Sequence, residues 1–316
     1  MKISILNHCY LTPSHIDQLK KLGEVTEYSN TTTEADALER SKGSEVIIAD
    51  GFEFSMNKSF FESAKDLKYV CLNSTGFDIV DIQAAKEKGI HISNLPGFST
   101  EAVAEHAIAL MFAVSRKIVT GNRAMHEKPF QLNPANRAHD MYIGKNLKEK
   151  TLGVIGLGQI GTRITELGKG LGMKVVGYNR TPKEIAGVTM VDLDTLFKQS
   201  DMIILAAAYG ENLKYLINEK SISQMQSEAI IINIGRGEFV DETAMSKALS
   251  EHRIAGFGAD VITNWSLDNP LLKFENVVLT PHMAFLADES LKNMADMIVR
   301  NVESFVRGKA ENVVNL

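Results

Sequence analysis

Short runs of apolar, largely β-branched residues recur along this chain and alternate with stretches that have helical spacing. Such alternation predicts βαβ units, in which helices join the parallel strands of a sheet. The runs are apolar on both faces, as in IIIN at 230–233, which is typical of a sheet covered by helices on both sides. The predicted strands are Lys2–Asn7, Glu45–Asp50, Lys68–Asn73, His91–Ser93, Thr151–Gly156, Lys174–Asn179, Met202–Ala207, Ala229–Ile234, Ile254–Val261 and Asn276–Thr280.

One segment interrupts this rhythm and divides the chain. The spacing predicts a long helix over Thr100–His126, followed by an irregular segment, Glu127–Lys150, that reads as a loop or a subunit-wrapping arm. A chain of 316 residues is long enough for two domains. We therefore predict two Rossmann-like α/β domains with parallel sheets and a cleft between them, one formed by residues 1–98 plus 286–316 and the other by residues 99–285.

Charge and cysteine content narrow the class of partner and compartment. The chain has 34 Lys and Arg against 39 Asp and Glu, which argues against a general nucleic-acid binder because such proteins usually carry a basic face. No apolar run is long enough for a membrane span, and the first ten residues are too short and polar for a signal peptide. Cys9 and Cys71 lie in apolar, strand-like sequence. We therefore expect a cytoplasmic protein without membrane or nucleic-acid partners.

The sequence TLGVIGLGQIG, beginning at Thr151, predicts a dinucleotide site. A strand runs into the glycine pattern, and a helix and a second strand follow, which is the context that makes GxGxxG specific. The first glycine suits a tight turn, the second lets the backbone approach a pyrophosphate, and the third lets helix and strand pack closely. The predicted cofactor-binding residues here are Gly156, Gly158, Gln159, Ile160 and Gly161.

The end of the second strand bears on the choice between NAD and NADP. NAD enzymes usually place Asp or Glu there to bind the ribose 2′-hydroxyl. This chain has Asn179, Arg180 and Thr181 instead, a neutral, a cationic and a hydroxyl side chain that suit a 2′-phosphate. We predict NADP as the cofactor, with NAD possible, since a solvated basic turn that tolerates either cofactor is the alternative interpretation.

Two further predicted strand ends are followed by candidate catalytic residues. Arg236 follows a predicted strand and is flanked by glycines, which points it into the crevice where α/β folds bind ligands, although a surface ion pair is the alternative. His282 directly follows the last predicted strand of the same domain. Histidine is the side chain best suited to donate a proton near neutral pH. Of the other histidines, we expect His106 to be a packed interface residue.

Several blocks together resemble the D-isomer-specific 2-hydroxyacid dehydrogenases, and they occur in that family's order over essentially the whole chain. Within the family, the C-terminal sequence looks most like the glycerate dehydrogenase and hydroxypyruvate or glyoxylate reductase group. The blocks are the glycine motif, STGFDIVD from Ser74, SNLPGFSTEAVAEHAIAL from Ser93, NIGRGEFVDE from Asn233, GFGADV from Gly256 and TPHMAF from Thr280.

The resemblance implies roles for individual residues. Arg236 matches the arginine that binds the substrate carboxylate and polarises the carbonyl, and His282 matches the general acid. Three residues match the loop whose backbone N–H groups hold the carboxylate, and three match positions that contact the cofactor. The first set is Ser74, Thr75 and Gly76, and the second is Asp260, Thr100 and Val103.

The chain departs from the family pattern after Asp260. The family has a Glu there that is hydrogen-bonded to the catalytic histidine, whereas this stretch is about two residues short and contains no Glu. Counting forward places Trp265 at that position, and Asp268 is a candidate substitute. A milder departure is Ala206–Ala208, which replaces a His-x-Pro-like stretch that usually lines the cofactor.

The sequence therefore predicts an NAD(P)-dependent D-2-hydroxyacid dehydrogenase that reduces a small 2-oxo acid resembling glyoxylate or hydroxypyruvate. No metal is expected among the site groups. The family implies a homodimer, with contacts through the helix from Glu101, including the apolar MFAV at 111–114, and through the arm Glu127–Lys150. The alternative is a non-catalytic dinucleotide sensor or scaffold of the same fold, suggested by the missing Glu and opposed by the presence of both Arg236 and His282.

Overall fold

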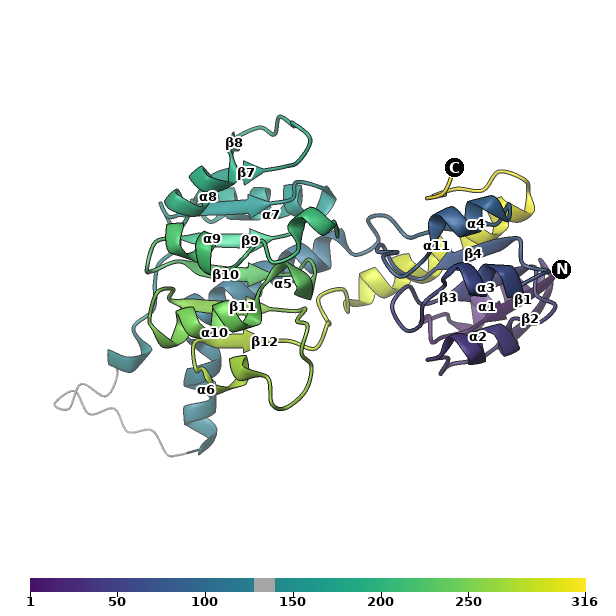
Figure 1. Ribbon diagram of the computed structural model, residues 1–316, viewed down its shortest axis with the longest axis horizontal. Coiled ribbons are helices and arrows are strands. Elements are labelled where there is room, and N and C mark those ends of the chain that lie inside the picture. Colours follow the sequence, from purple (N-terminus) through teal and green to yellow (C-terminus); the bar gives the residue numbers. More distant parts are fainter. Residues whose placement is uncertain (128–139) are drawn as a thin grey trace. The chain divides into compact units, whose positions relative to one another are not determined.

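The structure is a computed structural model that describes residues 1–127 and 140–316. The described chain forms two compact units: Met1–Ser99 with Leu286–Leu316, here called unit 1, and Thr100–Phe285, here called unit 2. Each unit is a parallel sheet with helices on both faces (Figure 1). This confirms the predicted α/β class with two parallel sheets, while the roles assigned to the two domains remain predictions.

Unit 1 contains a five-stranded sheet in the order β2-β1-β3-β4-β5. Its strands are β1 (Lys2–Ile5), β2 (Glu24–Glu27), β3 (Val46–Ala49), β4 (Tyr69–Leu72) and β5 (His91–Ser93). All neighbouring pairs are parallel, with Ile3 opposite Val46 in the register of β1 and β3. The sequence prediction missed β2, because the sequence EVTE lacks an apolar run; charged residues of this kind are common on an edge strand.

Helices cover both faces of this sheet. Helices α2, α3 and α4 contribute to one apolar cluster with β3 and β4, and α1 and α11 pack together on another part of the unit. The helix bounds are α1 (Pro13–Lys20), α2 (Glu34–Arg40), α3 (Lys58–Ser63), α4 (Ile82–Glu87) and α11 (Asp288–Val306). The ring of Phe305 on α11 stacks on Tyr69 of β4 at a centroid distance of 4.3 Å. The C-terminal helix therefore belongs to the core of unit 1.

Unit 2 contains a seven-stranded parallel sheet in the order β12-β11-β10-β9-β6-β7-β8. The strands are β6 (Thr151–Ile155), β7 (Lys174–Tyr178), β8 (Thr189–Met190), β9 (Met202–Leu205), β10 (Ile230–Asn233), β11 (Gly256–Ala259) and β12 (Val277–Leu279). The chain builds outward from β6 in one direction and then returns to add β9 on its other side. Ligands of open α/β sheets bind at such a switch point, here between β6 and β9. The two-residue strand β8 was not predicted.

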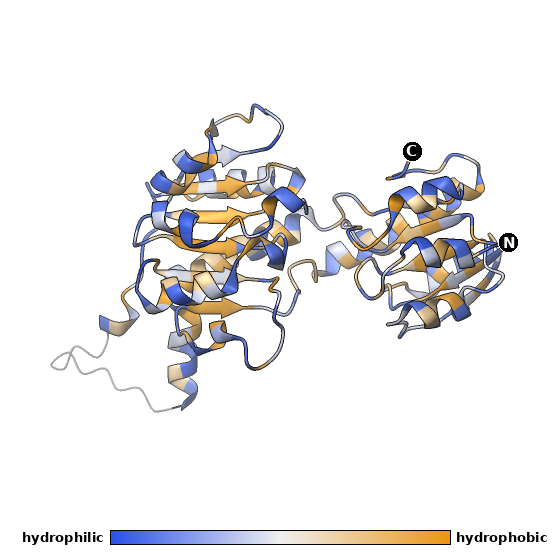
Figure 2. Cartoon of the chain, in the orientation of Figure 1, coloured by the Kyte–Doolittle hydropathy of each residue, from blue (hydrophilic) through white to orange (hydrophobic). Residues whose placement is uncertain are grey.

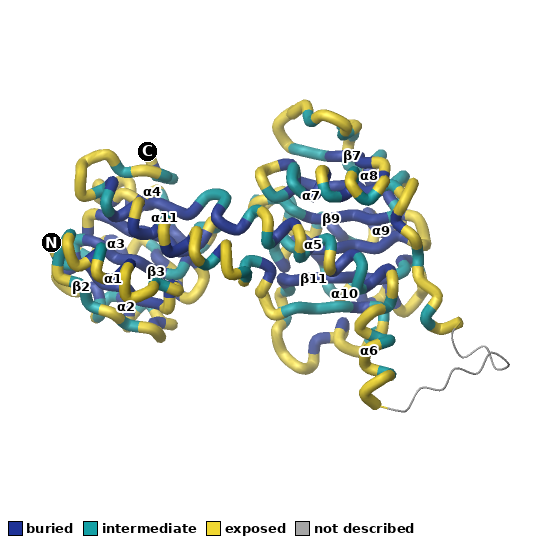
Figure 3. Tube along the Cα trace, turned by 180° about the vertical axis from the view of Figure 1, so that it is seen from behind, coloured by how far each residue is buried: buried dark blue, intermediate teal, exposed yellow. Residues whose placement is uncertain are grey.

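The strands of unit 2 alternate their side chains between two apolar clusters. Ile203, Leu205 and Ile231 face the helices α8, α9 and α10, whereas Ile204 and Ile232 face α5 and α7. The helix bounds are α5 (Thr100–Ser115), α6 (Ile118–Glu127), α7 (Gln159–Gly170), α8 (Leu193–Gln199), α9 (Glu219–Gln224) and α10 (Glu242–Ser250). Both faces are covered, so the central strands β6, β9 and β10 are largely apolar (Figure 2) and almost entirely buried (Figure 3).

Single 3-10 turns complete the secondary structure of unit 2. They are η2 (Asp140–Tyr142), η3 (Glu211–Leu213), η4 (Gly237–Phe239) and η5 (Pro270–Lys273). Among the helices that the structure describes, none combines the length and the apolar character needed to cross a bilayer.

The predicted helix over 100–126 is in fact two helices. It ends at Ser115, and α6 begins after Lys117, whose φ of 52° places it in the left-handed region. The expectation that MFAV at 111–114 faces a partner subunit was also wrong for two of its residues. Met111 and Val114 are buried against the sheet of unit 2, because α5 presents its apolar face to β10 and β11.

Candidate functional site

Unit 2 gathers its chemically important residues along one edge of the sheet. All its strands are parallel, so their carboxyl ends lie on the same side. The turns after β6, β7 and β11 carry predicted cofactor-binding residues, and the turns after β10 and β12 carry the predicted catalytic residues. In sheet order, the residues at this edge are His282, Asp260, Arg236, Ala207, Gly156 and Asn179.

The glycine turn after β6 has the shape that a pyrophosphate needs. Gly156 has a φ of 91°, and a Cβ on it would collide with the backbone of Ala207 after β9. A Cβ on Gly161 would collide with the carbonyl oxygen of Gly156, so α7 lies directly against the turn. In contrast, a Cβ on Gly158 would meet nothing within 4 Å. The open space at Gly158 is where the backbone can approach a phosphate, and the residues present therefore fit a dinucleotide.

The first turn of α7 adds positive potential to this space. Gly158 is the N-cap and supplies no side-chain hydrogen bond to the helix. Among the described residues, the N–H groups of Gln159 and Ile160 have no acceptor. Unpaired N–H groups and the helix dipole favour an anion at such an end. The Thr100 hydroxyl donates to Gln159 Oε1 at 3.3 Å, while Val103, one turn later on α5, is 8% exposed.

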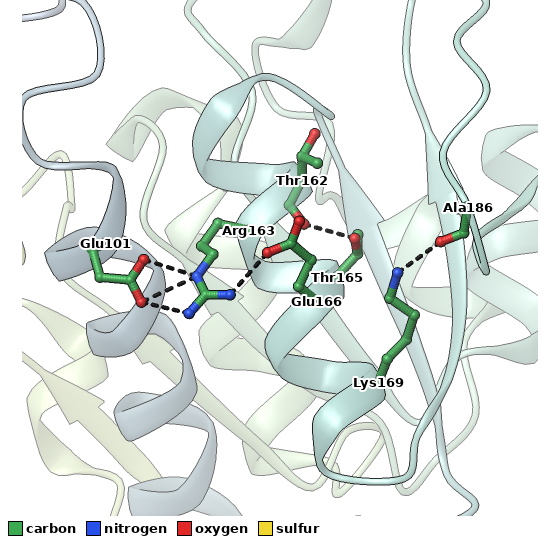
Figure 4. Close-up of polar contacts among 7 residues, drawn as sticks. All are labelled: Glu101, Thr162, Arg163, Thr165, Glu166, Lys169 and Ala186. Atoms are coloured by element: carbon green, nitrogen blue, oxygen red, sulfur yellow. Dashed lines mark hydrogen bonds and ion pairs between the residues drawn. The ribbon is translucent and has the colours of Figure 1, made fainter.

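An ion-pair network joins α5 to α7 behind this turn (Figure 4). The guanidinium of Arg163 on α7 donates to both carboxylate oxygens of Glu101 at 2.7–3.0 Å and to Glu166 at 2.8 Å. These bonds lower the pKa of the Glu101 carboxyl below its usual value. The pairing fixes the start of α5 beside the start of α7, where Thr100 and Gln159 lie.

The turn after β7 contains the residues predicted to read the cofactor's ribose. The side-chain amide of Asn179 forms hydrogen bonds within the protein. Its Oδ1 accepts from the N–H of Leu157 at 3.0 Å, and its Nδ2 donates to the carbonyl oxygen of Thr181 at 2.7 Å. Arg180 and Thr181 are exposed at the same turn. Asn179 therefore orders the turn, and cationic and hydroxyl groups remain at its surface.

Arg236 is positioned by a buried amide. Asn233, fully buried at the end of β10, donates from Nδ2 to the Arg236 carbonyl oxygen at 2.8 Å and accepts from the N–H of Gly235 at 3.1 Å. The guanidinium donates to the Gly235 carbonyl oxygen at 2.9 Å. On the other side, a Cβ on Gly237 would lie 2.5 Å from the carbonyl carbon of Ile262. The turn is therefore packed so closely that its backbone path is fixed.

His282 lies in a loop that Asp260 organises. Asp260 is 2% exposed, and its carboxylate accepts from the Thr280 hydroxyl at 2.6 Å and from the N–H groups of Met283 and Ala284, both at 2.9 Å. His282 itself is exposed with a φ of 51°, and its N–H donates to the Asp260 carbonyl oxygen at 3.0 Å. The predicted cofactor contact of Asp260 stays a prediction, because the hydrogen bonds described for its carboxylate all come from this loop.

His106 on α5 extends this hydrogen-bond chain, and the sequence did not reveal its role. Its Nε2 lies 3.0 Å from the Thr280 hydroxyl and 3.6 Å from the carboxylate of Asp260. Since the single hydroxyl proton of Thr280 goes to Asp260, the hydroxyl accepts from His106, whose Nε2 must carry a proton. We had expected His106 to be a packed interface residue. It instead meets Thr280, far away in the sequence, because α5 packs on the sheet.

The stretch after Asp260, where the resemblance led us to expect a Glu, forms a loop held by Glu242. The carboxylate of Glu242, at the start of α10, accepts from the N–H and hydroxyl of Thr263 at 2.6 and 2.7 Å and from Asn269 at 3.2 Å. Trp265 is 54% exposed in this loop. Asp268 accepts from Ser266 and Asn264, and the bond from Ser266 lowers its pKa. The hydrogen bonds found for Asp268 are therefore local to its own loop.

In unit 1, the predicted carboxylate-binding loop follows β4 and turns its side chains inward. The Ser74 hydroxyl donates to the Gly76 carbonyl oxygen at 2.7 Å, and the Thr75 hydroxyl donates to that of Leu95 at 2.8 Å. Within the described parts of the chain, the backbone N–H groups of Ser74, Thr75 and Gly76 have no hydrogen-bond acceptor. Consecutive unpaired N–H groups form an anion-binding concavity. The backbone N–H groups of this loop are therefore available to bind a carboxylate.

Gly51 fixes the position of this loop, which the sequence did not indicate. A Cβ on Gly51 would collide with the hydroxyl oxygen of Ser74 and would lie 2.9 Å from the carbonyl oxygen of Gly76. The turn after β3 is thus pressed directly against the loop after β4. Any side chain at residue 51 has to displace the loop or its own strand.

Comparisons with known proteins agree with these features. The family model described as D-isomer specific 2-hydroxyacid dehydrogenase, NAD binding domain, matches residues 108–284. A glyoxylate reductase of Thermococcus litoralis is 37% identical over 82% of this chain and 80% of that protein. A hydroxypyruvate reductase of Blautia hydrogenotrophica is 33% identical over the whole of both chains.

Solved structures give the same result for the fold. An acyclic imino acid reductase in complex with NADPH and D-arginine superposes with a TM-score of 0.91, at 31% identity, over 99% of this chain and 100% of that chain. The glycine turn with its open space, the unpaired start of α7 and the family match together show an NAD(P)-binding unit. The chain belongs to the D-isomer-specific 2-hydroxyacid dehydrogenase family of NAD(P)-dependent oxidoreductases.

Proposed function

We propose that this enzyme reduces a small 2-oxo acid of the glyoxylate or hydroxypyruvate type to the D-2-hydroxy acid, with NADPH as the preferred cofactor. The observation that carries the proposal is the placement of Arg236 after β10 and His282 after β12, at the same sheet edge as the glycine turn. The relatives named glyoxylate reductase and hydroxypyruvate reductase support the substrate class. A non-catalytic sensor finds no support among them.

The side chains divide the work as follows. Arg236 offers a planar, permanently charged fork that binds the substrate carboxylate and polarises the carbonyl oxygen. His282 donates a proton to that oxygen as the carbonyl carbon is reduced, and water reprotonates the imidazole afterwards. Ser74, Thr75 and Gly76 bind the carboxylate through their N–H groups. When bound, the reduced nicotinamide supplies the hydride for the carbonyl carbon.

The preference for NADPH is proposed from the turn after β7. Asn179 replaces the acidic residue that would repel a 2′-phosphate, and Arg180 is exposed beside it. Arg180→Ala should weaken NADPH binding by roughly tenfold and leave NADH nearly unchanged, because charge-assisted contacts to phosphate are lost for one cofactor alone. Equal losses for both cofactors would remove Arg180 from this role.

We propose that the chain forms a homodimer through a surface that includes α6. None of the residues of this helix is buried in the single chain, and Ile118 and Met125 are 54% and 61% exposed. Apolar side chains exposed on one element are typical of an interaction surface. The predicted arm Glu127–Lys150 lies partly outside the described residues, at 128–139. Sedimentation velocity of the wild type and of an Ile118→Glu variant tests this, since the charged variant should sediment as a monomer.

A cytoplasmic location is proposed from the two cysteines. Both Cys9 and Cys71 are buried thiols that form no disulfide, and burial raises the pKa of each to about 12. Thiols held in this state fit a reducing compartment. Fractionation of the source cells with an antibody to this chain would test the location.

The activity is tested by a matrix of cofactors and substrates. Loss of reduced-nicotinamide absorbance is measured with NADPH and NADH against glyoxylate, hydroxypyruvate, pyruvate and longer 2-oxo acids, and the product's configuration is assigned by a stereospecific assay. We expect the highest kcat/KM with NADPH and one of the two smallest substrates. Turnover confined to long apolar 2-oxo acids, or an L-product, would overturn the substrate or the stereochemical part of the proposal.

A further inference from the structure

The loop after β7, residues 179–187, is bound to the glycine turn by two side chains that meet at one residue. Leu157, between Gly156 and Gly158, is 1% exposed. Its N–H donates to Asn179 Oδ1 at 3.0 Å, and its carbonyl oxygen accepts from the ammonium of Lys183 at 2.8 Å. Both backbone polar groups of Leu157 are therefore bonded to the loop.

The opposite end of the same loop is bound to α7 by another lysine. The ammonium of Lys169 donates to the carbonyl oxygen of Ala186 at 2.7 Å (Figure 4). Lys169 lies in the last turn of α7, far along the helix from the glycine turn. The two lysines thus make the same kind of bond, an ammonium to a backbone carbonyl. One runs from the middle of the loop to the glycine turn, and the other from α7 to Ala186 near the end of the loop.

The position of the Lys183 ammonium matters for the cofactor. In dinucleotide folds the pyrophosphate lies on the glycine turn, and the ribose 2′ substituent lies at the end of the second strand. The ammonium of Lys183 is bonded to the first of these elements and carried by the loop that follows the second. An ammonium has three donors, so the bond to Leu157 leaves capacity for phosphate oxygens.

We propose that Lys183 is a specificity-determining residue that binds the 2′-phosphate of NADPH. Asn179 next to it is neutral, and its amide is committed to Leu157 and Thr181. Lys183 supplies a localised positive charge that is held at the glycine turn before the cofactor binds. Its side chain therefore loses little conformational entropy on binding. The inference rests on the proposed preference for NADPH and names the residue that contributes to it.

The test measures binding without turnover. Dissociation constants of NADPH and NADH are measured from nicotinamide fluorescence, and those of 2′,5′-ADP and 5′-AMP by calorimetry, for the wild type, Lys183→Gln and Lys183→Arg. We expect Lys183→Gln to weaken NADPH and 2′,5′-ADP by roughly tenfold, because a charge-assisted phosphate contact is lost. NADH and 5′-AMP should change by less than about twofold, and Lys183→Arg should restore 2′,5′-ADP binding.

Lys169→Gln is the matched control, because it removes an equivalent bond to the same loop away from the glycine turn. It should leave the ratio of NADPH to NADH affinity unchanged. Equal weakening of all four ligands by Lys183→Gln, no weakening of any, or the same selective loss in Lys169→Gln would each overturn the proposal. If the wild type itself prefers NADH, the proposed cofactor preference fails, whereas the 2′,5′-ADP affinities still decide the role of Lys183.

Discussion

The sheet edges of the two units offer ligands different kinds of group. After β4 in unit 1, the loop at Ser74 turns its hydroxyls inward and leaves three consecutive N–H groups for an anion. After β10 and β12 in unit 2, the groups offered are the side chains of Arg236 and His282, while buried Asn233 and Asp260 fix the backbone beneath them. We therefore expect the edge in unit 1 to bind an anion through backbone N–H groups and the edge in unit 2 to act through side chains.

This difference determines which substitutions should matter. In unit 2 we propose that the side chains of Arg236 and His282 carry the function, so a substitution that changes their chemistry without moving the backbone should be severe. In unit 1 a side chain can change with little effect as long as the loop keeps its path, and a change that moves the loop should be damaging even when it removes no functional group.

The largest effect is expected at His282. His282→Asn should lower kcat by about a hundredfold to ten-thousandfold, the usual contribution of a positioned general acid. Asn tolerates the φ of 51° found there, so the loop should keep its shape. The matched control is His252→Asn, since His252 is also exposed, with a φ of 54°. Steady-state kinetics of both variants check this, and a His282→Asn enzyme with wild-type kcat would exclude it as the acid.

The next effect concerns the arginine. Arg236→Lys keeps the charge but loses the planar fork that binds a carboxylate through two bonds. We expect kcat/KM to fall by roughly ten- to a hundredfold, as for the loss of one charged hydrogen bond. The affinity for NADPH, measured by fluorescence, should be unchanged. Wild-type kcat/KM in this variant would make Arg236 a structural residue and remove the contrast between the two edges.

A backbone displacement in unit 1 should come third. Gly51→Ala forces the loop away from its path, and we expect KM for the 2-oxo acid to rise about tenfold through misplacement of the N–H groups. The double variant Gly51→Ala/Ser74→Ala removes the hydroxyl that collides with the new Cβ, so it should recover part of the loss. Thermal melting identifies any variant that fails to fold. An unchanged KM in a folded Gly51→Ala enzyme would show that the loop path does not control substrate binding.

The smallest effect should be that of a loop side chain. Ser74→Ala removes an internal hydrogen bond to Gly76 but leaves the three N–H groups in place. We expect KM to rise by less than about fivefold, within the net value of one neutral hydrogen bond. The comparison with Gly51→Ala is made in the same assay. A larger loss in Ser74→Ala than in Gly51→Ala would mean that the serine hydroxyl itself contacts the substrate.

Much of the fold was predictable because the pattern is local. Strands buried on both faces require continuous apolar runs, so most strands of both sheets stood out in the sequence. The edge strand β2 and the two-residue strand β8 did not, because edge strands need little apolar content. The break after Ser115 was also missed, since apolar residues continue into α6 and no Pro or Gly marks the position.

The glycine turn, and the side chains that follow the ends of β7, β10 and β12, could be identified from the sequence, since each depends on residues adjacent in the chain. The residues that support these features became visible only in the folded chain. His106 meets Thr280 across a separation of 174 residues, Gly51 meets Ser74 from a neighbouring strand, and Lys183 reaches back to Leu157. Such contacts depend on strand order and on helix packing, and local sequence patterns do not indicate which turns become neighbours in the fold.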